Sequence, residues 1–162
     1  MLRRTGPSRS RHRSRGQSLA EFAVVFPVLM LVLGGIIQFG IIFWGLNTLN
    51  QVVRDTGRWA STQQVCSTIP ARDAVIATAN SIAQGSSLIG YTAGEFTPAN
   101  TTVAWPVQPP PHDLDPCPPL DNQDVRYVSI TITHSVPIFF PFVPGNGQLS
   151  SATEFRMEPK PQ

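Results

Sequence analysis

The sequence predicts an α+β protein with a long N-terminal transmembrane and spine helix, a second helix, and a small, mainly antiparallel sheet outside the membrane. Three observations lead to this fold class. Residues 22–46 form a run of 25 residues without a charge. The residues after this run keep the apolar spacing of a helix, and three later segments alternate between apolar and polar residues as strands do.

The apolar run at residues 22–46 is long enough to cross a bilayer. As a helix that rises about 1.5 Å per residue it spans roughly 37 Å, whereas the hydrocarbon core is about 30 Å thick. Sixteen of its residues are Leu, Ile, Val or Phe, and Gln38 is its only strongly polar side chain. The run also exceeds the roughly 7–15 apolar residues of a secretory signal peptide. We therefore expect a membrane helix that stays in the chain.

Charge on the two sides of the run predicts its orientation. Residues 1–16 contain six arginines and no acid, and no basic residue follows the run until Arg54. Such a bias places the N-terminus in the cytoplasm and the C-terminus outside. The sequence thus divides into a basic cytoplasmic leader (1–16), a transmembrane helix (17–46) and an extracytoplasmic α+β domain (47–162). Because topology accounts for the arginines, we expect no nucleic-acid partner.

The elements of the outer domain follow from periodicity. Apolar residues at helical spacing from Leu46 to Ala60 predict that the first helix continues beyond the membrane. A second helix is predicted over residues 70–84, with a proline in its first turn and Gly85 as its stop. Alternation predicts strands over residues 101–107, 125–136 and 148–157. The order of these strands in the sheet does not follow from the pattern.

The segment from Gly16 to Phe22 allows two interpretations. In the first, Ser18 and Glu21 form a capping box, in which each side chain accepts a hydrogen bond from a free backbone N–H at the start of a helix. In the second, the segment is a processing site. A basic leader, a glycine, a glutamate five residues later and an unbroken apolar helix together resemble the leader junction of type IV-like pilins.

A narrower resemblance extends this second interpretation. Leu19-Ala20-Glu21-Phe22, the early Pro27, and residues 50–60 with Arg54, Gly57 and Arg58 resemble the TadE-like family, whose members are minor pilins or pseudopilins of the tight-adherence (Flp) pilus. The resemblance implies that a prepilin peptidase cuts between Gly16 and Gln17. It also implies that Glu21, with Phe22 beside it, acts in assembly by pairing with the new amine of a neighbouring subunit.

Partners and location follow from the same resemblance. It implies a prepilin peptidase, the major Flp pilin, other pseudopilins and an inner-membrane assembly platform as partners, besides membrane lipid. The implied location is the bacterial cytoplasmic membrane, in a single pass, with incorporation in the pilus as a further option. The implied role is priming or tipping the pilus. The alternative is a permanently anchored extracytoplasmic binding or scaffold module that is never processed.

An apolar segment between the last two predicted strands is unusual for a loop. It contains Ile138, Phe139, Phe140 and Phe142 between prolines. Such a segment is able to cap the core, to rest on the bilayer, or to contact another subunit. Apart from core capping, we favour subunit contact, because exposed apolar patches commonly mark interaction sites.

The remaining chemistry of the sequence is sparse. Cys66 and Cys117 are the only cysteines, and both are predicted to lie outside, where either a disulfide or two free thiols are compatible with the sequence. Their separation and the absence of a suitable His spacing do not suggest a zinc site. No hydrolase, phosphate-loop or dinucleotide-binding motif is present. We therefore expect no enzymatic activity, no metal and no cofactor.

Overall fold

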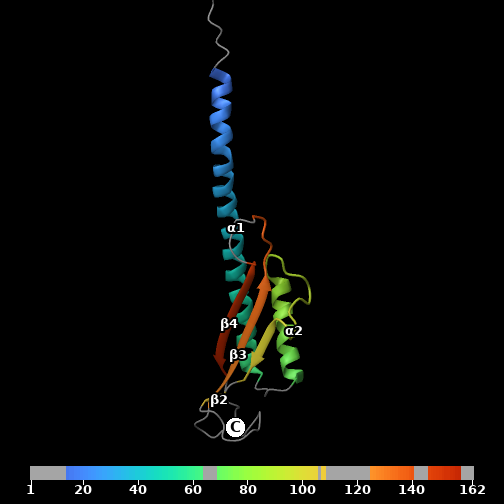
Figure 1. The fold of residues 1–162 in the computed structure, drawn as a ribbon. Helices are drawn as coiled ribbons and strands as arrows, with labels where there is room; N and C mark the ends of the chain where they lie inside the picture. The colour runs from blue at the N-terminus through green and yellow to red at the C-terminus, as the bar shows by residue number, and fades with distance from the viewer. Residues whose placement is uncertain (1–13, 64–68, 106, 109–124, 141–145, 158–162) are drawn as a thin grey trace, which may run out of the picture. The chain divides into compact units, whose positions relative to one another are not determined.

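The computed structural model of the chain describes residues 14–63, 69–105, 107–108, 125–140 and 146–157. The chain divides into two compact units, residues 1–37 and residues 38–162. The first helix runs through the boundary and contributes to both units (Figure 1). We refer to residues 38–162 as the folded unit.

Two helices are present in the described residues, as the sequence predicts. Helix α1 covers Ser14–Thr62 and contains 49 residues, and helix α2 covers Ile69–Gly85. The apolar run and the stripe that follows it therefore form one continuous helix. Gly85 is the last residue of α2, where a glycine is expected to end a helix.

The strands form one antiparallel arrangement around a long central strand. These are β1 (Thr101–Ala104), β2 (Val107–Gln108), β3 (Val125–Ser135) and β4 (Gln148–Arg156). Strand β3 pairs with all three others, and every pairing is antiparallel. The predicted α+β class, with its small antiparallel sheet, is confirmed.

Strands β1 and β2 pair with successive parts of β3 in one continuous register. The pairs Thr101 with Ile132 and Val107 with Arg126 belong to the same register, since each step forward in one strand is a step back in β3. The sequence predicts a single strand here. Pro106 stands between the two pieces, and a proline has no backbone N–H to give to a ladder.

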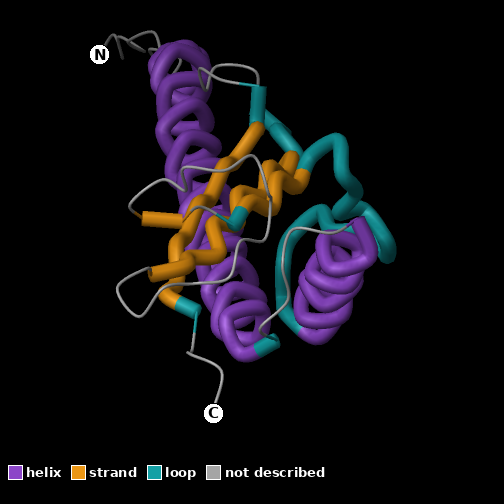
Figure 2. The backbone as a smooth tube through the Cα atoms, turned by 90° about the horizontal axis from the view of Figure 1, so that it is seen from below, coloured by secondary structure: helices purple, strands orange, loops and turns teal. Residues whose placement is uncertain are grey.

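One core joins the inner face of the sheet to both helices (Figure 2). Val128, Ile130 and Ile132 alternate along β3 and are fully buried. The helices add their own apolar stripes: Leu49, Val52, Val53 and Ala60 from α1, and Val75, Ile76, Ala79 and Ala83 from α2. Each fully buried Val, Leu or Ile stabilises the fold by about 1.5–3 kcal/mol relative to exposure, so this contact is the main source of stability.

Two glycines let α1 approach the sheet closely. A Cβ atom at Gly57 would lie 2.5 Å from Cδ2 of Phe155 and 3.1 Å from Cγ2 of Thr153, both on β4. At Gly45 it would lie 2.9 Å from Cγ1 of Val136 and 3.1 Å from Cδ1 of Leu149. A side chain at either position would require the helix or the facing side chains to shift. Gly57 lies in the segment whose residues resemble the TadE-like pattern, and this packing supplies a structural reason for a glycine there.

Residues 14–37 of α1 have a different character. Pro27 lies inside the helix, where it removes one hydrogen-bond donor. From Leu19 to Ile37 large apolar side chains are exposed around the helix, among them Val24 at 73% and Ile36 at 64%. In water this surface would be strongly unfavourable, so the segment requires an apolar environment or a partner.

We predict that Gly57→Ala lowers the stability of the folded unit by about 1–3 kcal/mol, the usual cost of overpacking a well-filled contact. The measurement is thermal unfolding of the full chain in detergent, followed by circular dichroism. Gly85→Ala is the matched control, because a Cβ atom there meets nothing within 4 Å. Equal stability of the two variants would contradict the close approach of α1 to β4.

Candidate functional site

The predicted processing junction lies near the start of α1. Gly16, Gln17 and Glu21 are exposed, and the side-chain amide of Gln17 donates a hydrogen bond of 3.1 Å to Oε1 of Glu21. Because α1 begins at Ser14, Ser18 lies inside the helix and is not its N-cap. The capping-box interpretation therefore does not describe this uncut chain.

The surroundings of the junction are sterically open. A Cβ atom at Gly16 would meet nothing within 4 Å, so the fold does not explain why a glycine stands there. Glycine weakens a helix by roughly 1 kcal/mol relative to alanine, which eases local opening of the backbone. Phe22 is 62% exposed and lies against Phe26, with ring centroids 5.3 Å apart. The junction is accessible, and its residues are not needed by the core.

The apolar surface after the junction fits a membrane. Residues 16–62 of α1 are long and apolar enough to cross a bilayer, with a mean hydropathy of 2.4 in the most apolar window. Only 11% of that window is buried within the structure. The helix thus lacks the cover that a core helix of a soluble protein would have, and it fits single-pass membrane anchoring.

A polar clasp joins α1 to the segment between β3 and β4. Gln38 is fully buried. Its amide nitrogen donates to the carbonyl oxygen of Pro137 at 3.1 Å, and its Oε1 accepts from the backbone N–H of Phe139 at 2.8 Å. We call this pair of bonds the Gln38 clasp. The sequence shows Gln38 as the only strongly polar side chain of the apolar run but does not show its partners, which lie about 100 positions away.

The base of the same segment is fixed by the backbone. The N–H of Val136 donates to the carbonyl oxygen of Gly147 at 2.9 Å. Gly147 has a φ of 71°, and a Cβ atom there would lie 2.5 Å from the carbonyl oxygen of Val136. A glycine is therefore required for this close return of the chain. With the clasp, two independent contacts hold the described residues 136–140.

The predicted contact residues in this segment differ in exposure. Phe139 is 65% exposed and Ile138 is 36% exposed, whereas Phe140 is half-buried. Phe142 lies outside the described residues, as do Cys66 and Cys117, so the predicted disulfide stays a prediction. Ile138 and Phe139 are therefore the exposed members of the set among the described residues.

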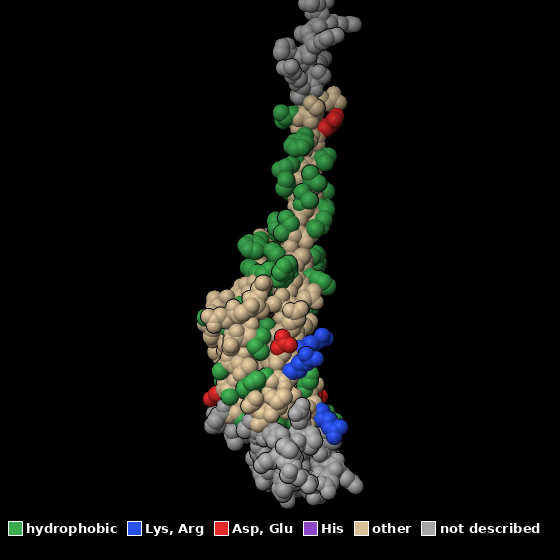
Figure 3. All heavy atoms as spheres, turned by 180° about the vertical axis from the view of Figure 1, so that it is seen from behind, with side chains coloured by type: hydrophobic (Ala, Val, Ile, Leu, Met, Phe, Trp, Pro, Cys, Tyr) green, Lys and Arg blue, Asp and Glu red, His purple; other side chains and the backbone are tan. Residues whose placement is uncertain are grey.

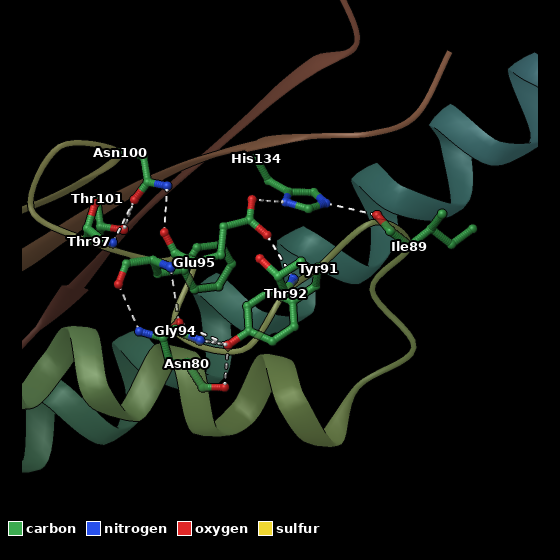
Figure 4. A network of polar contacts seen from close by, with 11 residues as sticks. Asn80, Ile89, Tyr91, Thr92, Gly94, Glu95, Thr97, Asn100, Thr101 and His134 are labelled. Atoms are coloured by element: carbon green, nitrogen blue, oxygen red, sulfur yellow. Dashed lines mark hydrogen bonds and ion pairs between the residues drawn. The ribbon is translucent and has the colours of Figure 1, made fainter. Parts of the chain in front are cut away.

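A buried histidine lies on the inner face of the sheet near the end of β3 (Figure 4). His134 is 1% exposed, with Nδ1 2.7 Å from Oε1 of Glu95 and Nε2 2.9 Å from the carbonyl oxygen of Ile89. A neutral imidazole carries one N–H, so both contacts are hydrogen bonds only if the ring is protonated or Glu95 carries the proton. The sequence alone does not indicate a partner for His134. His134 continues the alternation of Val128, Ile130 and Ile132, and this spacing indicates that its side chain is buried.

A second amide clasp holds the loop that carries Glu95. Asn80 of α2 donates from Nδ2 to the carbonyl oxygen of Phe96 at 2.8 Å, and its Oδ1 accepts from the N–H of Phe96 at 3.0 Å. The hydroxyl of Tyr91 also donates to Oδ1 of Asn80, at 2.9 Å (Figure 4). This network orders the loop after α2. Among the described residues, no group of three His, Cys, Asp or Glu could hold a metal ion.

The geometry thus fits a single-pass membrane anchor in α1, and residues of the same helix pack in the core of the small α+β folded unit. Residues 16–58 match the family model described as TadE-like protein, so this segment is TadE-like, as its residues predict. The match begins at the predicted junction and ends at Arg58. It implies a protein associated with the Tad pilus. The chain matches no curated protein and no solved structure.

We predict that Gln38→Leu releases residues 136–140 from α1. The N–H of Phe139 and the carbonyl of Pro137 would lose their partner, and a lost net contribution of about 1.4 kcal/mol corresponds to roughly tenfold faster local opening. Hydrogen–deuterium exchange of the full chain measures this at the amide of Phe139. Gln51→Leu is the matched control, since Gln51 is an exposed glutamine of the same helix without the clasp. Unchanged exchange in Gln38→Leu would contradict the clasp.

Proposed function

We propose that the chain is a minor pilin or pseudopilin that acts in assembly of a tight-adherence (Flp) pilus, at its initiation or its tip. In this proposal a prepilin peptidase first removes residues 1–16. The TadE-like match over residues 16–58 is the observation that supports the proposal most strongly, because it covers the junction, the apolar helix and the start of the spine together.

The junction is suited to cleavage. Gly16 and Gln17 are exposed and take no part in the core, so the bond between them can be presented to a membrane peptidase without unfolding the rest of the chain. Cleavage would free the amine of Gln17 about one helical turn from the carboxylate of Glu21. A carboxylate at mid-membrane costs about 2.5–3.5 kcal/mol on insertion scales, and less near the interface. A nearby ammonium, of the same chain or of a neighbour, offsets part of that cost.

The exposed apolar half of α1 is suited to assembly. Between lipid and a neighbouring helix the apolar surface gains little from the hydrophobic effect, so close packing and polar pairs decide whether helices associate. In this proposal Glu21 supplies the polar pair and residues 19–37 supply the packing surface. The partners are the major pilin, other pseudopilins and the inner-membrane platform. The role is structural and not enzymatic, with the N-terminus in the cytoplasm and the folded unit outside.

We predict that Gly16→Val blocks both processing and pilus assembly. Valine at position 16 faces open space in the fold, so the variant folds normally, but the peptidase meets a branched side chain where it needs a glycine. Intact mass of the protein from native membranes should show a chain beginning at Gln17 in the wild type and at Met1 in the variant. Pili should be lost with the variant and restored by the wild type.

Gly85→Val serves as the control, because it introduces the same side chain at another open glycine. It should be cut and should support pili. A wild-type chain that still begins at Met1 in cells with an active prepilin peptidase would instead identify a permanently anchored module.

A further inference from the structure

The exposed apolar side chains of the folded unit are confined to one end. Among its described residues the large hydrophobic side chains that are exposed number five, and we call them the apolar collar: Phe39, Phe43, Trp44, Ile138 and Phe139. Three come from the first turns of α1 in the unit, and two from the segment that the Gln38 clasp ties to that helix. The collar residues of α1 lie within about 8 Å of one another along the helix axis.

The chain segments that carry the collar contain no formal charge, and Glu95 of the neighbouring loop is paired with His134. Residues 38–53 and 127–153 contain no Asp, Glu, Lys or Arg. The first charge on α1 after Gln38 is Arg54, about 24 Å further along the helix. On the face shown in Figure 3, the blue and red side chains of the folded unit also lie away from this end. A surface meant for water would not keep five large apolar groups together without charged neighbours.

Uncharged polar groups follow the collar. A groove of 530 Å³ is lined by Phe43 and Trp44 and then by the polar side chains of Asn47, Thr48, Gln51, Ser86 and Ser87. Nε1 of Trp44 donates to the carbonyl oxygen of Ser87 at 3.3 Å. Along α1 the surface therefore changes from aliphatic to aromatic to uncharged polar within a few turns. A membrane–water interface shows this order, and tryptophan is enriched there.

We propose that the apolar collar is seated in the outer boundary of the bilayer, with Ile138 and Phe139 inserted among lipid acyl chains beside α1. The partner is lipid, because the collar directly follows residues 19–37 in the sequence, and most of those residues are apolar. Those 19 residues rise about 28 Å, close to the roughly 30 Å of the hydrocarbon core. The crossing therefore ends where Gln38 and the collar begin.

The Gln38 clasp supplies hydrogen-bond partners for two backbone groups that this segment would bring into lipid. A backbone N–H or C=O that enters lipid without a partner costs several kcal/mol. Here the N–H of Phe139 and the carbonyl of Pro137 are both bonded to Gln38, and Pro137 has no N–H. The polar amide of Gln38 is itself fully covered. This inference goes beyond the proposed function, since it holds whether or not the chain is cut or joins a pilus.

The test uses the full wild-type chain in phosphatidylethanolamine–phosphatidylglycerol vesicles that contain a phospholipid with a photoactivatable diazirine on its acyl chain. After illumination and trypsin digestion, residues 127–156 form one peptide, because no Lys or Arg lies between Arg126 and Arg156. Fragment masses should place lipid adducts on Ile138 and Phe139. Strand β4 in the same peptide is the internal control and should carry none, and the peptide that ends at Arg54 is the positive control.

Three results would overturn the proposal or part of it. Adducts on α1 but none on residues 138–139 would exclude insertion of this segment into lipid. Equal labelling of β4 would show that the reagent does not distinguish the collar. Gln38→Leu should lower the labelling of residues 138–139 severalfold relative to α1, and unchanged labelling would exclude the clasp as the device that holds them in lipid.

Discussion

The folded unit depends on the burial of one side of α1 against the inner face of the sheet. Leu49, Val52 and Val53 reach the core only because Gly45 and Gly57 let the helix come close to β4 and to Val136. Strand β3 supplies the other half of the contact and pairs with every other strand. An anchor helix alone would leave this stripe exposed outside the membrane. The helix and the sheet therefore bury each other's apolar faces in one core.

Side-chain amides provide hydrogen-bond partners for loop backbone groups that this packing removes from water. Gln38 and Asn80 each bond to both a backbone N–H and a backbone C=O of a loop, as a neighbouring strand would. A buried donor or acceptor without a partner costs about 1–3 kcal/mol, so each amide removes two such costs. As a result, two irregular segments, before Thr101 and after Ser135, are hydrogen-bonded to a helix side chain.

The sequence predicts this fold well where signals are long and periodic. The continuous helix, the second helix and the long strand β3 all follow from apolar spacing, and the TadE-like segment follows from residues between Gly16 and Arg58. The strand order does not, because pairings such as Thr101 with Ile132 depend on contacts far apart in the sequence. The split between β1 and β2 was readable from Pro106 in principle.

The candidate sites also divide into one that is a local sequence pattern and others that depend on contacts between distant residues. The junction at Gly16 and Glu21 is a local pattern, so it is visible in the sequence. The Gln38 clasp and the pair of His134 with Glu95 join residues 99 to 101 and 39 positions apart, and only a folded chain brings them together. The sequence singles out Gln38 by its polarity within the apolar run and His134 by its place in the strand alternation. It does not indicate which residues they bind.

In the proposed function, the exposed apolar half of α1 is an assembly surface whose polar element is Glu21. The most direct measurement is site-specific photo-crosslinking from position 22, with a benzophenone amino acid in place of Phe22, in cells that make pili. The proposed function predicts a cross-link to a pilin or pseudopilin chain, and its loss when Glu21→Gln removes the charge. Cross-links to lipid alone, in cells that carry normal pili, would contradict it.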